Sequence, residues 1–172
     1  MNIKDILLAL CVVVIWGVNF VIIKLGVTAL PPLLLGALRF VFVAFPAIFL
    51  FKRPNIPFRL LLIYGLTISF GQFAFLFCAL HVGMPAGIAS VILQSQAFFT
   101  LLLGAIILKE SLQLNHFIGM FIAIAGLAVL ANGATAGGID DIPLIGLVFI
   151  LIAGLSWATG NITNRIIMQK QG

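Results

Sequence analysis

The sequence predicts an all-α integral membrane protein. Of its 172 residues, 63% are hydrophobic and 8% are charged, whereas soluble domains have about 45–50% apolar and about 25% charged residues. Several uncharged stretches approach or exceed the roughly 20 apolar residues that a helix needs to cross a bilayer. None shows the alternation of apolar and polar residues that a membrane β-barrel requires. Lipid is therefore the expected solvent for most of the surface.

The first two predicted spans lie near the N-terminus. The first covers Ile6–Ile23, between charged residues on either side, and it lacks the small-residue cleavage site of a signal peptide. The second begins near Pro31 and Pro32, because proline suits the first turn of a helix, and it ends at about Phe51. Arg39 lies well inside this second span.

The uncharged stretch from Leu60 to Leu108 is too long for one span. As a single helix it would be about 73 Å long, whereas the bilayer core is about 30 Å thick. The glycines and the proline of residues 81–87 supply a turn in its middle. The stretch therefore predicts two spans, at about 60–80 and 87–108.

Two further spans complete an expected set of six. One covers Phe117–Ala131, and the other runs from Ile142 to about Ile162. Between them lies a glycine-rich, acidic linker at 132–141.

The distribution of basic residues predicts the orientation. If the N-terminus is cytoplasmic, the inside loops hold seven Lys and Arg residues: Lys4, Lys52, Arg53, Arg59, Lys109, Arg165 and Lys170. The outside loops hold Lys24 alone, and this excess is the one expected of cytoplasmic loops. Asp140 is then outside. Because the basic residues form no stripe, no nucleic-acid partner is predicted.

The first and sixth predicted spans share a short internal sequence repeat, which we call the internal echo. Each has the order Trp, Asn and then a cation eight residues beyond the Trp: Trp16, Asn19 and Lys24, and Trp157, Asn161 and Arg165. Five spans separate the two copies, so the second enters the membrane from the opposite side, as in inverted-repeat transporters. Interfacial anchoring of span ends by Trp and a cation is the alternative interpretation.

Four segments together resemble the EamA family of the drug/metabolite transporter superfamily. They are 13–24 (VVIWGVNFVIIK), 30–40 (LPPLLLGALRF), 83–90 (GMPAGIAS) and 93–99 (LQSQAFF). The resemblance implies ten helices, as two inverted five-helix repeats, in the bacterial inner membrane. It also implies a secondary transporter that exports small amino-acid-like metabolites of the cysteine and O-acetylserine type along a path between the repeats.

On this interpretation the chain holds one repeat and part of another. Residues 1–131 are the first five-helix repeat, 132–141 are a periplasmic linker, and 142–172 hold the first helix of a truncated second repeat. The expected partners are the lipid bilayer, a small-molecule substrate, and either the missing second repeat or a second copy of the chain.

Arg39 is the first candidate for substrate binding. It lies about 12 Å past Pro31, near the membrane midplane, where a lipid-facing charge is costly. We expect it to face an interior cavity and to bind a substrate carboxylate or, alternatively, to cap backbone carbonyls of a neighbouring helix. No Asp or Glu accompanies it inside the predicted spans.

Uncharged polar and aromatic residues complete the predicted site. The full set is Trp16, Asn19, Arg39, Gln72, Gln94, Trp157 and Asn161. Helical spacing groups Gly65, Ser69 and Gln72 on the third span, and Gly87, Ser90 and Gln94 on the fourth. For each Asn or Gln, a hydrogen bond between helices is the alternative role.

Two further features of the fourth span have structural interpretations. The face formed by Gln96, Thr100 and Gly104 is expected to pack against another helix. Glu110 is expected to lie before the positive N-terminus of the next helix.

The motif content argues against an enzyme. The chain has no HExxH, GxSxG or P-loop sequence, and Cys11 and Cys78 lie apart in apolar runs. No cofactor or metal is predicted. The alternatives to an exporter of amino-acid-like compounds are an exporter of another small metabolite, a membrane enzyme and a non-transporting membrane scaffold.

Overall fold

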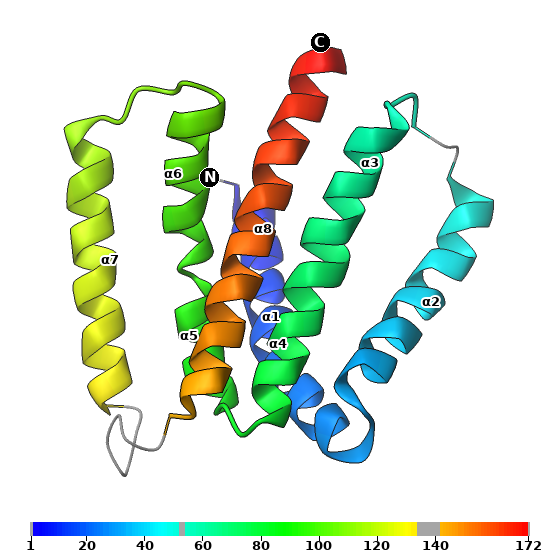
Figure 1. Ribbon diagram of the computed structural model, residues 1–172, viewed down its shortest axis with the longest axis vertical. Coiled ribbons are helices and arrows are strands. Elements are labelled where there is room, and N and C mark those ends of the chain that lie inside the picture. Colours follow the sequence, from blue (N-terminus) through cyan, green and yellow to red (C-terminus); the bar gives the residue numbers. More distant parts are fainter. Residues whose placement is uncertain (1, 52–53, 134–141, 172) are drawn as a thin grey trace.

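A computed structural model of the chain describes residues 2–51, 54–133 and 142–171. Within these ranges the chain forms helices and no strands (Figure 1). The helices are α1 (Ile3–Ala29), α2 (Pro32–Leu50), α3 (Phe58–Tyr64), the π-helix η1 (Gly65–Gly71), α4 (Gln72–His81), α5 (Ala86–Leu93), α6 (Gln96–Ile107), α7 (Leu114–Gly133) and α8 (Leu144–Gln171).

Five stretches of helix are long and apolar enough to cross a membrane. They are Ile3–Ala29, Pro32–Leu50, Phe58–His81, Ala86–Ile107 and Leu144–Lys170. The third contains α3, η1 and α4, and the fourth contains α5 and α6. The remaining predicted span corresponds to α7, an apolar helix whose passage through the bilayer stays a prediction.

Helices α1 and α8 extend beyond the span ends that were predicted from the positions of charged residues. Both Lys4 and Lys24 lie within α1, which begins at a capping box formed by Asn2 and Asp5. Lys24 is accommodated because its Nζ donates hydrogen bonds to backbone carbonyls at the end of α4 and in the turn that follows. Helix α8 continues for nine residues past Ile162, to Gln171.

The predicted turn between the third and fourth spans is present at 82–85. Gly83 has a φ of 106°, a conformation that glycine adopts without strain, and Met84 N–H donates to the carbonyl of Ala79. Pro85 then precedes the first residue of α5. Glycine and proline therefore reverse the chain where the length of the apolar stretch required it.

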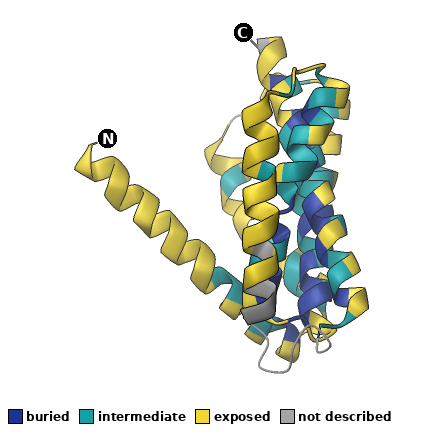
Figure 2. Cartoon of the chain, turned by 90° about the vertical axis from the view of Figure 1, so that its left-hand side faces the viewer, coloured by how far each residue is buried: buried dark blue, intermediate teal, exposed yellow. Residues whose placement is uncertain are grey.

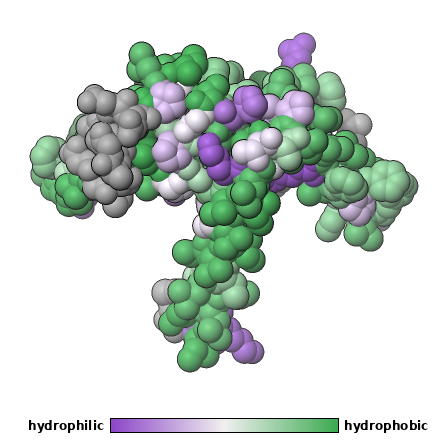
Figure 3. Space-filling view, turned by 90° about the horizontal axis from the view of Figure 1, so that it is seen from below, coloured by the Kyte–Doolittle hydropathy of each residue, from purple (hydrophilic) through white to green (hydrophobic). Residues whose placement is uncertain are grey.

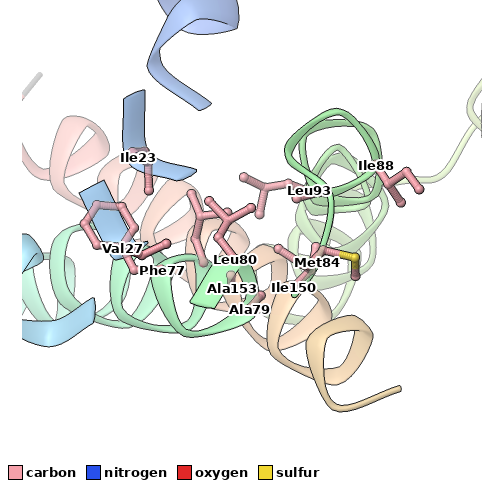
Figure 4. Close-up of a cluster of buried hydrophobic side chains, with 12 residues drawn as sticks. Ile23, Val27, Phe77, Ala79, Leu80, Met84, Ile88, Leu93, Ile150 and Ala153 are labelled. Atoms are coloured by element: carbon pink, nitrogen blue, oxygen red, sulfur yellow. The ribbon is translucent and has the colours of Figure 1, made fainter. Parts of the chain in front are cut away.

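The buried core lies at the end of the bundle that contains this turn (Figure 4). It is formed by the C-terminal part of α1, by α4 and the turn that follows it, by α5, and by the N-terminal part of α8. Its members are Ile23, Val27, Leu76, Phe77, Ala79, Leu80, Met84, Ile88, Ala89, Leu93, Ile150 and Ala153.

Helix α1 joins this core only near its C-terminal end. Residues 2–18 are all exposed, and Ile23 and Val27 are its buried residues. Figure 2 shows the N-terminal part of α1 leaning away from the other helices. Viewed from below, the projecting helix is covered by apolar side chains, and polar ones gather where it meets the rest of the molecule (Figure 3). An apolar surface of this kind suits lipid or another apolar helix.

Helix α8 lies among the others and contacts α3, η1, α4, α5 and α6. Glycine allows the close approach. A Cβ at Gly160 would lie 2.7 Å from Cβ of Ile68 in η1, and a Cβ at Gly154 would lie 3.0 Å from Oγ of Ser95. Small residues are what such close helix packing in membranes requires.

The connections alternate between the two ends of the bundle. The links from α2 to α3 and from α6 to α7 lie at the end where α8 finishes, and the turn from α4 to α5 lies at the other (Figure 1). Helices α1 and α8 run in opposite directions. The alternation agrees with the predicted topology, whereas the side of the membrane on which the N-terminus lies stays a prediction.

Candidate functional site

A cavity of about 460 Å³ lies between α1, α2, the α3–η1–α4 stretch, α5 and α8. This central cavity is lined by six of the seven residues predicted for the site: Trp16, Asn19, Arg39, Gln72, Gln94 and Trp157. They come from helices far apart in the sequence, so the fold alone brings them together. The volume falls within the range of about 300–1,000 Å³ that is typical of small-ligand pockets.

Arg39 contributes a cation to the central cavity. Its Nη1 donates a hydrogen bond to Oδ1 of Asn19 at 3.1 Å, and its guanidinium carbon lies 4.5 Å from the ring centroid of Phe73. Among the residues that the structure describes, no carboxylate pairs with it. Asn19 and Phe73 therefore hold the guanidinium in place without neutralising its charge.

The two tryptophans of the internal echo both line the cavity and contact each other. The ring centroids of Trp16 and Trp157 lie 5.6 Å apart, with an interplanar angle of 52°. One comes from α1 and the other from α8, two helices of opposite direction. Together they form an aromatic wall.

The π-helix η1 places Gln72 at the cavity and changes the predicted face of the third span. Gln72 follows η1 directly and is 6% exposed. Ser69 lines the cavity beside it, but Gly65 lines a separate apolar groove between α2 and the third span. The prediction assumed α-helical spacing, and a π-helix turns less per residue, so Gly65 does not share the face of Gln72.

The fourth span is broken between α5 and α6, a feature that spacing did not predict. Gln94 and Ser90 line the cavity on the α5 side of the break. Ser95, the residue before α6, is buried, and its Oγ has no hydrogen-bond partner in the described part of the chain. Beyond the break the helix presents a different face.

Asn161 does not line the central cavity, contrary to the expectation for the site. Its Nδ2 donates to Oε1 of Gln96 at 3.1 Å and to Oγ1 of Thr100 at 3.3 Å. The reason lies in the spacing: Asn19 follows Trp16 by three residues, whereas Asn161 follows Trp157 by four, which rotates it by about 100° around the helix axis. These contacts fit the packing role expected for that face of the fourth span.

Glu110 has a partner that its expected role did not include. Arg165 on α8 donates through Nη1 to both carboxylate oxygens of Glu110 at 2.9 Å. Helix α7 begins at Leu114, and the expected effect of Glu110 on the start of that helix stays a prediction beside this ion pair.

Aromatic residues of the cavity escaped the sequence analysis. Phe20, Tyr64 and Phe73 all line it. Phe73 directly follows Gln72, which is the one available clue, since helices that are apolar on all sides show no distinguishing periodicity.

These features define a class: a multi-pass helical membrane protein whose spans surround a mainly apolar cavity that carries a cation and several polar side chains. The chain belongs to the EamA-like transporter family, which matches residues 3–132.

Individual relatives carry transporter names. A protein of Salmonella typhimurium named a probable amino-acid metabolite efflux pump is 56% identical over 98% of this chain and 56% of its own length. A protein of the same name from Escherichia coli is 54% identical over 98% of this chain and 56% of its own length. A third, the uncharacterised inner membrane transporter YedA of Escherichia coli, is 31% identical over 87% of this chain and 49% of its own length.

The chain thus spans about half the length of the curated relatives it matches. No solved structure matches it.

Proposed function

We propose that this chain belongs to a secondary transporter that exports small amino-acid-like metabolites, of the cysteine and O-acetylserine type, across the bacterial inner membrane. The observation that carries the proposal is the environment of Arg39. It is a cation in a small cavity, positioned by Asn19 and Phe73 and free of any acidic partner among the described residues. The name of the Salmonella and Escherichia relatives supports the same substrate class.

The cavity has the groups that a small zwitterion requires. The guanidinium donates charge-assisted hydrogen bonds to a carboxylate. The side-chain carbonyl oxygens of Gln72 and Gln94 accept hydrogen bonds from an ammonium group, and the faces of Trp16 and Trp157 attract a cation. A binding site requires such groups to lie together in one cavity, whereas a membrane scaffold does not.

The test replaces Arg39 and measures export of labelled O-acetyl-L-serine by cells that express the complete protein. Hydrogen bonds to charged groups contribute about 1.5–3 kcal/mol, so Arg39→Gln should reduce export at least about tenfold. Arg39→Lys should retain more export than Arg39→Gln, because lysine keeps the positive charge. It should not restore export fully, because the ammonium group is a point charge and lacks the planar fork of the guanidinium.

Arg59→Gln is the matched control, since it removes the same charge from an exposed position outside the cavity. Full export by an Arg39→Gln protein present at normal membrane levels would assign Arg39 to helix packing and remove the proposal.

We also propose the ten-helix arrangement, with residues 1–131 as one repeat, 132–141 as linker and 142–172 opening the second. The contact between Trp16 and Trp157 supports it, because equivalent residues of inverted repeats meet at the axis that relates them. The greater length of the relatives supports it as well. The partner of the exposed part of α1 is then a second repeat or a second copy. Export by purified 172-residue monomers in liposomes would contradict this arrangement.

For the orientation we propose a cytoplasmic N-terminus. Arg53 and Asp140 lie outside the described residues, on the two links that the topology assigns to opposite sides. A cysteine introduced at 53 should react with a membrane-impermeant reagent only in inverted vesicles, and one at 140 only in intact cells. The reverse pattern would overturn the orientation.

A further inference from the structure

A second polar pocket lies along α8, beyond the central cavity. Its volume is about 450 Å³, and Gln96, Thr100, Glu110, Asn161 and Arg165 are among the residues that line it. Glu110 belongs to the link between α6 and α7 and Arg165 to the last part of α8, so the pocket lies towards the end of the bundle where α8 finishes.

The second pocket lies further along α8 than the central cavity. Trp157 lines the central cavity, whereas Asn161 and Arg165, four and eight residues further along α8, line the second pocket. Arg165 is about 12 Å from Trp157 along the helix axis. On the opposite wall, the break between α5 and α6 directs Gln94 to the central cavity and Gln96 to the second pocket. The two spaces therefore follow one another along α8.

The backbone conformation next to Glu110 places its carboxylate in this pocket. Lys109 has a φ of 55°, a left-handed conformation that costs a non-glycine residue about 1–2 kcal/mol. It turns the chain so that Glu110 N–H donates to the carbonyl of Gly104. A Cβ at Gly104 would lie 2.9 Å from Oε2 of Glu110, so any larger residue there would require the carboxylate to move from its present position. Local strain of this sort is commonly found at functional sites.

The ion pair of this pocket retains capacity for a ligand. Nη1 of Arg165 serves both oxygens of Glu110, and no partner in the described ranges takes Nη2 or Nε. A carboxylate has about four acceptor positions, so Glu110 also has sites left. Both side chains are about half exposed, at 50% and 47%, and pairs so exposed contribute only about 0–1 kcal/mol. Rearranging this ion pair to bind a ligand therefore costs little free energy.

We infer that Glu110, Arg165 and the polar residues beside them form a second binding site for amino-acid-like zwitterions. The α-carboxylate and α-ammonium of such a molecule are one carbon apart, and the two side chains offer the complementary charges next to each other. Asn161, Gln96 and Thr100 provide further donors and acceptors. In the proposed topology this end is cytoplasmic, so the site receives the molecule before the central cavity does. The inference rests on the transport function proposed above.

The test compares the two sides of the membrane. The complete protein is reconstituted in liposomes in a single orientation, and transport of labelled O-acetyl-L-serine is measured from each side. Arg165→Gln should raise the KM about tenfold to a hundredfold for substrate on the side where α8 ends, because it removes a charge-assisted contact. The KM from the other side and the kcat should stay within about twofold, a change too small to represent a lost contact. Glu110→Gln should act in the same direction.

Lys170→Gln is the matched control, since it removes the same charge from the same helix outside the pocket. A purely structural ion pair predicts equal changes from both sides, or none, and either result overturns the inference.

Equilibrium binding to purified protein separates this site from the central one. Arg39→Gln should leave one binding event for O-acetyl-L-serine, and adding Arg165→Gln should abolish it. If Arg39→Gln alone removes all binding, the second site does not exist, although the transport proposal stands. If the wild-type protein binds none, both proposals fail.

Discussion

Replacing Gly160 by alanine tests whether the contact between α8 and the π-helix holds the cavity in shape. A Cβ at this position would lie 2.7 Å from Cβ and 3.3 Å from Cα of Ile68. Normal carbon–carbon contacts begin at about 3.5 Å, so the helices must separate by about 0.8 Å. The obstacle includes backbone, which a rotamer change does not relieve. Overpacking of this kind costs about 1–3 kcal/mol.

The assay is thermal unfolding of the purified protein in detergent. Alanine also favours helix over glycine by up to about 1 kcal/mol, so the reference is Gly119→Ala, where nothing lies within 4 Å of the new Cβ. At about 2–4 °C per kcal/mol, Gly160→Ala should melt about 2–12 °C below Gly119→Ala. Export should fall too, because Ile68 lines the central cavity. Melting temperatures within about 1 °C of each other would refute the reasoning.

Three further predictions concern single contacts. Lys24→Met removes two hydrogen bonds to backbone carbonyls and should lower the melting temperature by about 3–12 °C, whereas Lys4→Met, at an exposed position, should not. A double-mutant cycle of Trp16→Ala and Trp157→Ala should give a coupling of about 0.5–1.5 kcal/mol, and strictly additive effects would contradict their contact. Lys109→Gly should raise the melting temperature by about 2–8 °C, because glycine adopts a φ of 55° without strain; a decrease would show that this turn is not strained.

The sequence predicted best those features that the bilayer constrains directly, namely the lengths of the spans and the placement of polar residues. The length of apolar stretches, together with proline and glycine, located α2 and the turn after α4 to within a residue or two. Arg39, Gln72 and Gln94 drew attention because polar groups at membrane depth are costly and therefore face one another or a cavity.

What the sequence could not provide depends on contacts between distant segments. The π-helix and the break before Ser95 both lie against glycines of α8, and uniformly apolar segments give no sign of such irregularities. Asn161 contacts Gln96 and Thr100 instead of lining the central cavity, and the shift of one position that separates it from the equivalent of Asn19 did not by itself predict these contacts. The partnership of Arg165 with Glu110 joins residues 55 positions apart, which no local pattern reveals.

The position of α8 has a consequence for how the protein is made. Every other described helix except α1, α2 and α7 packs extensively against it, yet it follows all of them in the chain. During synthesis the earlier helices enter the bilayer before α8 can pack against Gly71 and before Asn161 can bond Gln96 and Thr100. Non-local contacts of this kind form slowly, and they expose incomplete intermediates to misassembly and to proteases. Substitutions on the packed face of α8 should therefore reduce the amount of protein in the membrane more than its melting temperature alone suggests.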